Sequence, residues 1–404
     1  MKQTDLKNIF SHYRERAPTI FKNKELLTER FSPGNILHRD PQINQLARIV
    51  APAVGGEKIS NTFIFGTVGT GKTLVTRHVT AELEKESPAI KTLYINCKMK
   101  RVSDTEYRLL AELVRALGGS VPATGLPTDQ VYTRFFSLLE QQKKTTVLIL
   151  DEVDNIIKNI GDDVLYSLLR VNQDLHDAHL SLIGISNDVQ FTDGLDPRVK
   201  SSLSEEEIIF PPYNATQLQD ILLQRTAEAF QEGVLDRGVV AKAAALAAQE
   251  HGDARKALDL LRVAGEVVER QGGQKVLIDH IDSASQKLDT DRTTEVLRTQ
   301  PKQSLAVLAS IITLSGDHGV QTGDVLSVYE KIAASRGLKV LTQRRISDLI
   351  NELDMLGIIS SRVVSKGRYG RTREIRVMLD PALLDKTRKI LEENYLLDRL
   401  GRFS

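Results

Sequence analysis

The apolar positions of the first 210 residues form short runs separated by longer amphipathic stretches. The runs lie at residues 62–65, 92–96, 146–150, 180–186 and 206–210. The run at 146–150 is almost continuously apolar, which is typical of a parallel strand covered on both faces. Because helical patterns separate the runs, we predict a three-layer α/β domain with a parallel five-stranded sheet.

The rest of the chain follows two further patterns. Residues 214 to about 287 are rich in Ala and Leu, with helical periodicity and no strand-like run, and a polar stretch containing Pro301 follows them. We therefore predict three domains: an α/β domain at 1–212 with an insertion at about 97–144, a helical domain at 213–290, and a third domain at 300–404.

The third domain has three amphipathic segments and two short β-branched runs. The runs span residues 358–364 and 373–379 and are joined by "SKGRYGRT", which contains two glycines. Three helices and a β-hairpin predict a winged helix-turn-helix. We expect Thr342 to cap the third helix and Gly357 to end it. The periodic apolar positions are Leu305, Leu308, Ile311 and Ile312; Val325, Val328, Tyr329 and Ile332; and Ile346, Leu349, Ile350, Leu353 and Leu356.

Composition limits the classes of protein that remain. The chain has 404 residues, 41% of them hydrophobic and 26% charged, and a single cysteine, Cys97. One cysteine excludes disulfides within the chain and cysteine-rich zinc sites. No segment approaches the roughly 20 apolar residues needed to span a bilayer. We expect a soluble, cytoplasmic protein, associated with the nucleoid and not with a membrane.

A phosphate-binding motif follows the first predicted strand. In the sequence "TFIFGTVGTGKT", four residues separate Gly66 from Gly71-Lys72-Thr73, and a helical pattern follows. Glycines let backbone N–H groups approach phosphate oxygens at a helix N-terminus. In such a loop the lysine reaches the β- and γ-phosphates and the threonine hydroxyl binds Mg²⁺. The predicted nucleotide-binding residues are Val68, Gly69, Thr70, Gly71, Lys72 and Thr73.

Two acids follow the buried run at 146–150. An NTPase of this kind needs a carboxylate at the end of a neighbouring strand, and "TTVLILDEVD" supplies Asp151 and Glu152. We expect Asp151 to hold Mg²⁺ through water and Glu152 to orient and polarise the attacking water. The alternative is that the acids only cap a helix. Together the two motifs predict binding of ATP or GTP.

Beyond these motifs, the chain resembles the AAA+ ATPases. Asn187, after the fourth predicted strand, matches a polar residue that contacts the γ-phosphate in that family. The segment "GLDPRVKSSL" is similar to its arginine-finger element, which implies that Arg198 completes the site of a neighbouring subunit. The alternative for Arg198 is an ordinary surface arginine after a proline turn.

The helical domain is similar to the AAA+ lid. It opens with "FPPYNATQLQDILLQR", and the resemblance implies that Tyr213 and Arg225 line the nucleotide pocket. The later segment "EHGDARKALDLLRVA" implies that Arg255 reaches the nucleotide from a helix that Asp253 caps. A surface arginine on a helix is the alternative for Arg255.

Within the AAA+ ATPases the resemblance narrows to archaeal replication initiators related to the origin recognition complex and its cell-division-cycle partner. The segment "NILHRDPQINQLARIVAP" matches this branch and implies that His38 and Arg39 lie near the adenine. The stretch "ALGGSVPATGLPTDQVY" at 116–132 resembles a helical insertion that touches DNA in these proteins. The insertion residues expected at DNA are Thr124, Gly125 and Leu126.

Positive charge is concentrated in residues 362–376 of the third domain, six of which are Lys or Arg, although the formal net charge of the chain is only +1. In a winged helix the third helix enters the major groove and the hairpin reaches a neighbouring groove or the backbone. A basic face is then expected where a polyanion must bind. The alternatives are a solvated hairpin and a winged helix that binds protein. The predicted DNA-binding residues are Gln343, Arg344 and Arg345 on the helix, and Lys366, Arg368, Tyr369, Arg371 and Arg373 on the wing.

The resemblance implies an ATP-dependent initiator that binds double-stranded origin DNA and helps to recruit or load the replicative helicase. It also implies that ATP/ADP exchange acts as a switch, with slow hydrolysis, and that other initiator copies or paralogues are partners. The alternative is a P-loop ATPase that regulates transcription or signalling through its winged helix.

Overall fold

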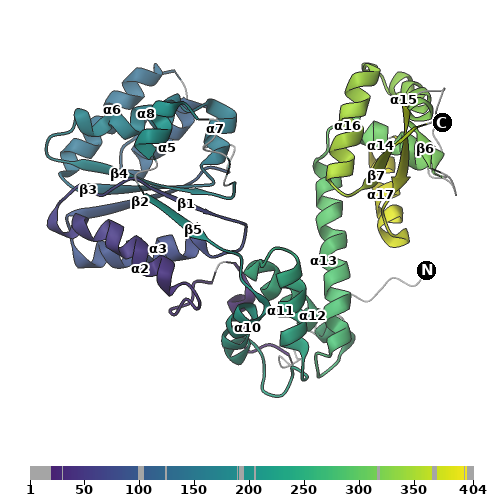
Figure 1. Ribbon diagram of the computed structural model, residues 1–404, viewed down its shortest axis with the longest axis horizontal. Coiled ribbons are helices and arrows are strands. Elements are labelled where there is room, and N and C mark those ends of the chain that lie inside the picture. Colours follow the sequence, from purple (N-terminus) through teal and green to yellow (C-terminus); the bar gives the residue numbers. More distant parts are fainter. Residues whose placement is uncertain are drawn as a thin grey trace, which may run out of the picture. The chain divides into compact units, whose positions relative to one another are not determined.

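The computed structural model describes residues 20–29, 31–98, 104–122, 125–188, 190, 195–203, 206–315, 319–365, 371–394 and 396–397. The chain divides into two compact units (Figure 1), and the boundary along the sequence lies between Asp282 and Ser283. Within the described ranges, no helix combines the length and the apolar character needed to cross a membrane.

A parallel five-stranded sheet forms the centre of the first unit, as predicted. All four neighbouring pairs of strands run in parallel. Each strand agrees with a predicted run to within two residues at either end. In spatial order the strands are β2 (Ile90–Asn96), β3 (Thr145–Asp151), β4 (His179–Ser186), β1 (Thr62–Gly66) and β5 (Glu206–Phe210).

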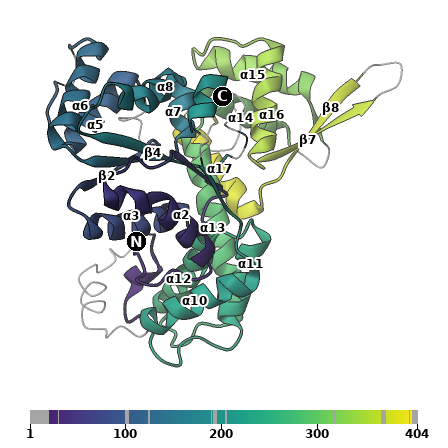
Figure 2. The same cartoon turned by 60° about the vertical axis from the view of Figure 1, so that its left-hand side comes forward.

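Helices cover both faces of this sheet (Figure 2). Alternate residues of β3 point to opposite faces, so Val147 and Ile149 join one core while Leu148 and Leu150 join the other. The first core packs against α2 (Asp40–Val50) and α3 (Lys72–Glu86), and η2 (Ala51–Gly55) follows α2. The second core includes residues of α5 (Glu106–Ala116), α6 (Thr128–Gln142), α7 (Asp154–Ile160), α8 (Asp163–Arg170), η3 (Val171–Gln173) and α9 (Pro197–Leu203).

Within its described residues, the predicted insertion contains two helices, α5 and α6. The stretch 116–132, which carries the resemblance to the initiators, consists mostly of the loop between them. Buried residues of both helices, such as Leu113 and Phe135, belong to the same core as β3. The insertion is therefore packed onto the domain by apolar contacts, and its connecting loop is the exposed part.

Four helices form the lid region of the first unit: α10 (Ala215–Ala229), α11 (Val239–Gln249), α12 (Ala254–Gln271) and the start of α13 (Ile278–Thr299). Asn214 and Gln217 make a reciprocal capping box at the start of α10. The N-terminal segment packs on this region through η1 (Lys24–Leu27) and through Phe21, whose ring centroid lies 4.8 Å from that of Phe230.

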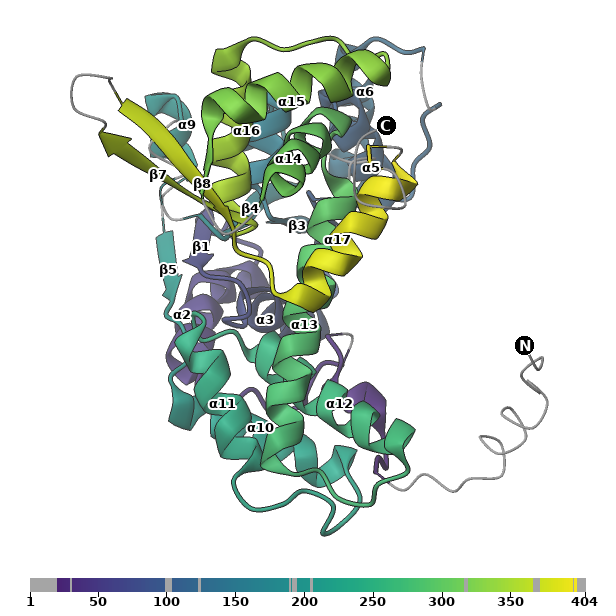
Figure 3. The ribbon, with the colours of Figure 1, turned by 90° about the vertical axis from the view of Figure 1, so that its right-hand side faces the viewer.

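The second unit is a winged helix (Figure 3). Its three central helices are α14 (Lys302–Leu314), α15 (Thr322–Ser335) and α16 (Gln343–Met355), and its antiparallel sheet has the order β6 (Val320–Gln321), β8 (Arg371–Val377), β7 (Ile359–Ser365). The Thr342 hydroxyl accepts the N–H of Arg345 at 3.4 Å, so it caps α16 as predicted. Gly357, with φ of +71°, follows the end of the helix.

Three elements around the winged helix were not predicted. Strand β6 is only two residues long, and α13 continues through residues 291–299, which lie between the predicted second and third domains. The C-terminal helix α17 (Pro381–Glu393) is capped by Asp380, whose carboxylate accepts the N–H of Leu383 at 2.9 Å. Ile390 and Leu391 join α17 to the core of the winged helix.

Candidate nucleotide site and nucleic-acid interface

The predicted phosphate-binding loop links the end of β1 to the start of α3. Gly69 and Gly71 have φ of +74° and +89°, a left-handed conformation that other residues adopt at a cost. Gly71 is the N-cap residue of α3, which runs for 15 residues. The N-terminus of a helix favours anions, because its first N–H groups have no partner within the helix. This geometry suits a bound phosphate.

Lys72 lies folded into this loop. Its Nζ donates to the carbonyls of Gly66 and Thr67, each at 2.7 Å, and to Oδ1 of Asn187 at 2.9 Å. Burial lowers the pKa of Lys72 to about 8, although the charge of Asp151 opposes the shift. The structure thus brings together Lys72 and Asn187, the two residues expected at the γ-phosphate.

Asp151 is the last residue of β3, and both oxygens of its buried carboxylate accept hydrogen bonds. Its Oδ2 accepts the hydroxyl of Thr73 at 2.8 Å and that of Tyr94 at 2.7 Å, while Oδ1 accepts the backbone N–H of Glu152 at 3.0 Å. A carboxylate and a hydroxyl are hard oxygen ligands of the kind that Mg²⁺ prefers. Asp151 and Thr73 therefore fit a magnesium ion. Sequence reasoning missed Tyr94, which no motif includes.

Glu152 adopts a left-handed backbone conformation, with φ of +54°. Its Oε2 accepts the side-chain amide of Asn155 at 3.4 Å, and its Oε1 lies 3.7 Å from the ammonium of Lys98. Non-glycine residues in this conformation are costly and cluster at functional sites. The side chain is 23% exposed, so water can reach the carboxylate.

The start of α12 contacts the phosphate-binding loop directly. The N–H of Ala254 donates to the carbonyl of Gly69 at 3.3 Å. Asp253 caps the helix as predicted, because its Oδ1 accepts the N–H groups of Arg255 and Lys256. A Cβ atom at Gly69 would lie only 1.7 Å from that same oxygen. The lid therefore lies so close to the loop that only a residue without a Cβ atom fits at position 69. The Arg255 side chain, 47% exposed, lies 3.7 Å from Glu29.

Arg39 connects the loop to the segment before the lid. Its guanidinium is buried and donates to the carbonyls of Thr70, at 2.9 Å, and Pro211, at 2.6 Å. It also stacks on Tyr213, with 3.7 Å between the guanidinium carbon and the ring centroid. His38 has φ of +57° and contacts Asp220 on α10 at 2.9 Å. The Arg39 side chain is therefore held mainly by backbone carbonyls.

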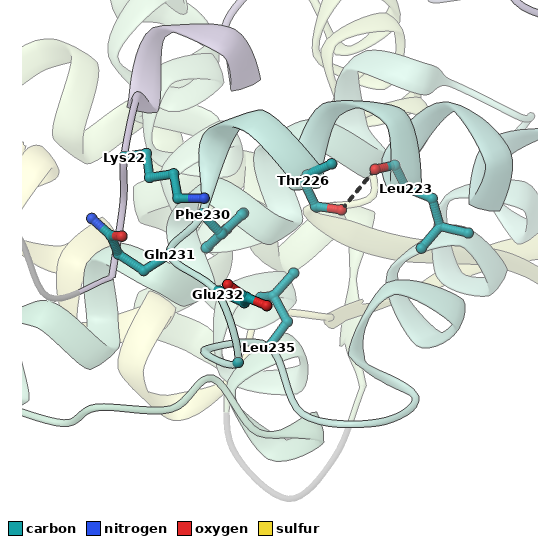
Figure 4. A pocket seen from close by; sticks show the side chains of 9 residues that line it. Lys22, Leu223, Thr226, Phe230, Gln231, Glu232 and Leu235 are labelled. Atoms are coloured by element: carbon teal, nitrogen blue, oxygen red, sulfur yellow. Dashed lines mark hydrogen bonds between the residues drawn. The ribbon is translucent and has the colours of Figure 1, made fainter.

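Arg225 lines a pocket of about 230 Å³ together with residues within 31–35 of the N-terminal segment. Its guanidinium stacks on Phe31 at 4.5 Å, and two of its buried nitrogens have no hydrogen-bond partner. A second pocket, of about 400 Å³, is lined by Lys22, Phe230 and neighbouring residues of α10 and the loop after it (Figure 4). Neither lining includes a residue of the phosphate-binding loop.

Arg198 lies in the first turn of α9 with a side chain that is 73% exposed. Its Nε and Nη2 donate to the two carboxylate oxygens of Asp196 at 3.0 and 2.9 Å. This pairing raises the pKa of Arg198 and lowers that of Asp196 to about 2. The guanidinium also lies over the ring of Tyr166, 5.4 Å from its centroid.

The predicted DNA contacts in the first unit lie in the loop between α5 and α6. Gly125 has φ of +103° and no atom within 4 Å of a Cβ at this position, and Leu126 is 36% exposed. Thr124 lies outside the described residues. Leu126 is therefore an exposed apolar side chain next to a glycine with free space around it, and a partner can reach both residues.

The first turn of α16 carries three exposed polar residues, Gln343, Arg344 and Arg345. They lie off the buried stripe of the helix, as predicted. Arg345 faces two acids on its own helix, with its Nη1 at 3.5 Å from Glu352 and 3.9 Å from Asp348. Any DNA phosphate must compete with these carboxylates for Arg345.

The wing tip falls outside the described residues, which leaves out Lys366, Arg368 and Tyr369. Arg371 begins β8, opposite Ser365 of β7. Arg373, two residues further along, donates from Nη1 to the side-chain oxygen of Asn351 on α16 at 2.6 Å. This bond joins the base of the wing to the helix that carries Arg344.

Three family models match the chain. They are an AAA domain at residues 58–190, a Cdc6 AAA+ ATPase-type lid domain at 219–286 and a CDC6 C-terminal winged helix domain at 295–387. Their order along the chain agrees with the order of the sheet, the lid helices and the winged helix.

Curated and solved proteins are similar over almost the whole chain. An ORC1-type DNA replication protein of Thermococcus onnurineus is 51% identical over 391 residues, covering 94% of this chain and 93% of that protein. ORC1-type DNA replication protein 1 of Methanosarcina mazei is also 51% identical, over 95% and 93%. The Aeropyrum pernix ORC1 protein, solved in complex with DNA, superposes with a TM-score of 0.83 at 42% identity over 94% and 98%. The chain therefore belongs to the ORC1-type replication initiators, built from an AAA+ domain, a Cdc6-type lid and a winged helix.

Proposed function

We propose that this protein is an ATP-dependent initiator that binds double-stranded DNA at replication origins and helps to recruit or load the replicative helicase. One observation supports this most strongly: 94% of the chain matches the Aeropyrum pernix ORC1 protein, which was solved in complex with DNA. Membership of the initiator family supports the link to origins. The recruitment of a helicase, and contacts with other initiator copies or paralogues, are further parts of the proposal.

In this proposal ATP or ADP binds at the loop from Val68 to Thr73. Lys72 exchanges its backbone carbonyl partners for the β- and γ-phosphates, and Asn187, already in contact with Lys72, lies near the γ-phosphate. Thr73 and Asp151 would hold Mg²⁺, which neutralises phosphate charge when bound. Glu152 orients and polarises a water molecule. The acid is held by Asn155 and Lys98, which favours slow hydrolysis and a role for ATP as a switch.

The remaining predicted residues surround this loop. We expect Arg255 to reach the phosphates, and the start of its helix against Gly69 supports this. His38, Arg39, Tyr213 and Arg225 would border the base side of the nucleotide. Among these, Arg39 and Tyr213 contribute chiefly by holding the loop, since the Arg39 guanidinium is already bonded to carbonyls.

Arg198 is proposed to act on the nucleotide of a neighbouring copy. Its guanidinium is exposed and extends from a helix that begins at Pro197. An arginine in this role stabilises the charge that develops on the transferred phosphoryl group. Asp196 holds the side chain until a more strongly charged partner replaces it.

For DNA, we assign base or phosphate contacts to the start of α16 and phosphate contacts to the wing. Gln343, Arg344 and Arg345 are exposed at the helix end that enters a major groove in winged helices. Lys366, Arg368, Tyr369, Arg371 and Arg373 supply the wing. Thr124, Gly125 and Leu126 would form a second, separate contact from the insertion.

Competition binding with purified full-length protein tests the proposal. Duplexes from the chromosomal regions where replication begins should bind more tightly than shuffled duplexes at the same salt concentration, and the preference should depend on bound ATP or ADP. A preference for promoter duplexes over origin duplexes would instead favour a transcription regulator with the same domains.

A further inference from the structure

The hydroxyl of Tyr94 is the feature of the nucleotide site that no sequence motif explains. It donates to Oδ2 of Asp151 at 2.7 Å, the same oxygen that the Thr73 hydroxyl contacts at 2.8 Å. Tyr94 lies on β2 two residues before Asn96, which pairs with Asp151 in the parallel ladder. Residues two apart on a strand share a face, so Tyr94 is a diagonal neighbour of Asp151.

The ring of Tyr94 is held in place independently of its hydroxyl. It packs against the core between the sheet and α3, and the guanidinium carbon of Arg77 lies 4.7 Å from its centroid. Arg77 follows Thr73 by one helical turn on α3. One short stretch of helix therefore contacts both Asp151, through Thr73, and the ring of Tyr94, through Arg77.

The two hydroxyls at Oδ2 have different tasks when a metal binds. Thr73 is expected to offer an oxygen lone pair to Mg²⁺, while its O–H can still donate to Asp151. The phenol of Tyr94 has no metal to bind and acts on the carboxylate alone. Partners of this kind fix the orientation of the carboxylates at a metal site and are important for metal affinity.

We propose that Tyr94 is a positioning residue for magnesium, which orients the carboxylate of Asp151 through its phenolic O–H. This inference rests on the magnesium role proposed above for Asp151. It assigns to the hydroxyl a task that the aromatic ring cannot perform alone. Replacing Tyr94 by Phe removes only that hydroxyl and keeps the ring beneath Arg77.

The chain provides a matched control. Tyr132 on α6 is also half-buried, and its hydroxyl donates to the carboxylate of Glu106 at 2.9 Å. Tyr132→Phe therefore removes the same kind of bond at a place that contains no residue of the phosphate-binding loop. Any loss shared by Tyr94→Phe and Tyr132→Phe reflects general packing or stability.

The experiment is a titration of ATP affinity against free Mg²⁺, with full-length wild type, Tyr94→Phe, Tyr132→Phe and Asp151→Asn. Thermal unfolding and binding of ADP in EDTA are measured on the same samples. We expect Tyr94→Phe to raise the Mg²⁺ concentration for half-maximal effect by about tenfold, the lower end for loss of an outer partner of a metal ligand. Its ADP affinity in EDTA and its melting temperature should match those of Tyr132→Phe.

Three results would overturn the inference. An unchanged Mg²⁺ midpoint in Tyr94→Phe would show that the hydroxyl does not position the ligand. If Tyr94→Phe lost as much affinity for ADP in EDTA as it lost for ATP with Mg²⁺, Tyr94 would have a structural role. If Asp151→Asn itself kept the wild-type Mg²⁺ dependence, the magnesium role of Asp151 would fail first, and that outcome is separate from the other two.

Discussion

The contact between the lid and the phosphate-binding loop makes a sharp prediction for Gly69→Ala. The new methyl carbon would lie 1.7 Å from Oδ1 and 2.3 Å from Cγ of Asp253. Real contacts of this kind are essentially never closer than 3.0 Å. Either the Asp253 side chain turns away and breaks the cap of α12, or the start of α12 withdraws and breaks the bond from Ala254 N–H to the Gly69 carbonyl. Both changes disturb the start of α12.

Gly69→Ala is expected to lower both the folding stability and the nucleotide affinity. A left-handed alanine costs about 1–2 kcal/mol of folding stability relative to glycine. A shift of α12 would also remove Arg255 from its proposed contact with the nucleotide, and a hydrogen bond to a charged group contributes about 1.5–3 kcal/mol. The nucleotide affinity of Gly69→Ala should thus fall by about 10- to 100-fold.

Gly233→Ala is a control that introduces the backbone strain of a left-handed alanine without a collision with another residue. Gly233 has φ of +73°, almost equal to that of Gly69, but no atom lies within 4 Å of a Cβ there. This control should lose a similar amount of stability and keep wild-type affinity for ADP and ATP. The assay is calorimetric titration with nucleotide, paired with thermal unfolding of each variant.

A second substitution tests whether the collision with Asp253 causes the loss of nucleotide affinity. Asp253→Ala removes the carboxylate that collides, at a cost of about 1 kcal/mol for the lost helix cap. Combined with Gly69→Ala, it should restore part of the nucleotide affinity, so the two changes should be less harmful together than their sum. If Gly69→Ala binds nucleotide as well as Gly233→Ala, the lid contact does not control the site.

Three further predictions address the other parts of the site. Lys72→Ala should abolish or severely weaken ATP binding, which equilibrium titration measures, whereas Glu152→Gln should keep ATP and lose turnover in a phosphate-release assay. Arg198→Ala should leave nucleotide affinity in dilute monomer unchanged and depress only the activity that depends on assembly; an equal loss of affinity in monomer would place Arg198 in its own subunit's pocket. Arg344→Ala should cost about 1–3 kcal/mol on the preferred DNA site while sparing other duplexes, and a uniform loss across sequences would contradict a base contact.

Much of the fold could be predicted because its signals are local. The strand runs, the loop from Gly66 to Thr73 and the acids after β3 each occupy one short stretch of sequence. The cap at Thr342 follows the same logic. The helix α17 was missed although Asp380 and Pro381 form an ordinary helix start. That omission was a missed local signal.

The contacts that complete the site could not be predicted, because they depend on which elements become neighbours. Tyr94 reaches Asp151 only because β2 pairs with β3 in one particular register. Asp253 meets Gly69 only because the lid packs on the loop. Arg39 was expected beside the adenine, yet its guanidinium is bonded to carbonyls at Thr70 and Pro211. Its role at the base stays a prediction.

The measurement that tests the central claim most directly is a genome-wide map of the protein's binding sites in its native host, compared with the positions where replication begins. The proposed initiator should occupy those positions, and a Lys72→Ala form should lose or redistribute that occupancy. Occupancy concentrated at promoters, with none at the starts of replication, would contradict the proposal and identify a regulator of transcription.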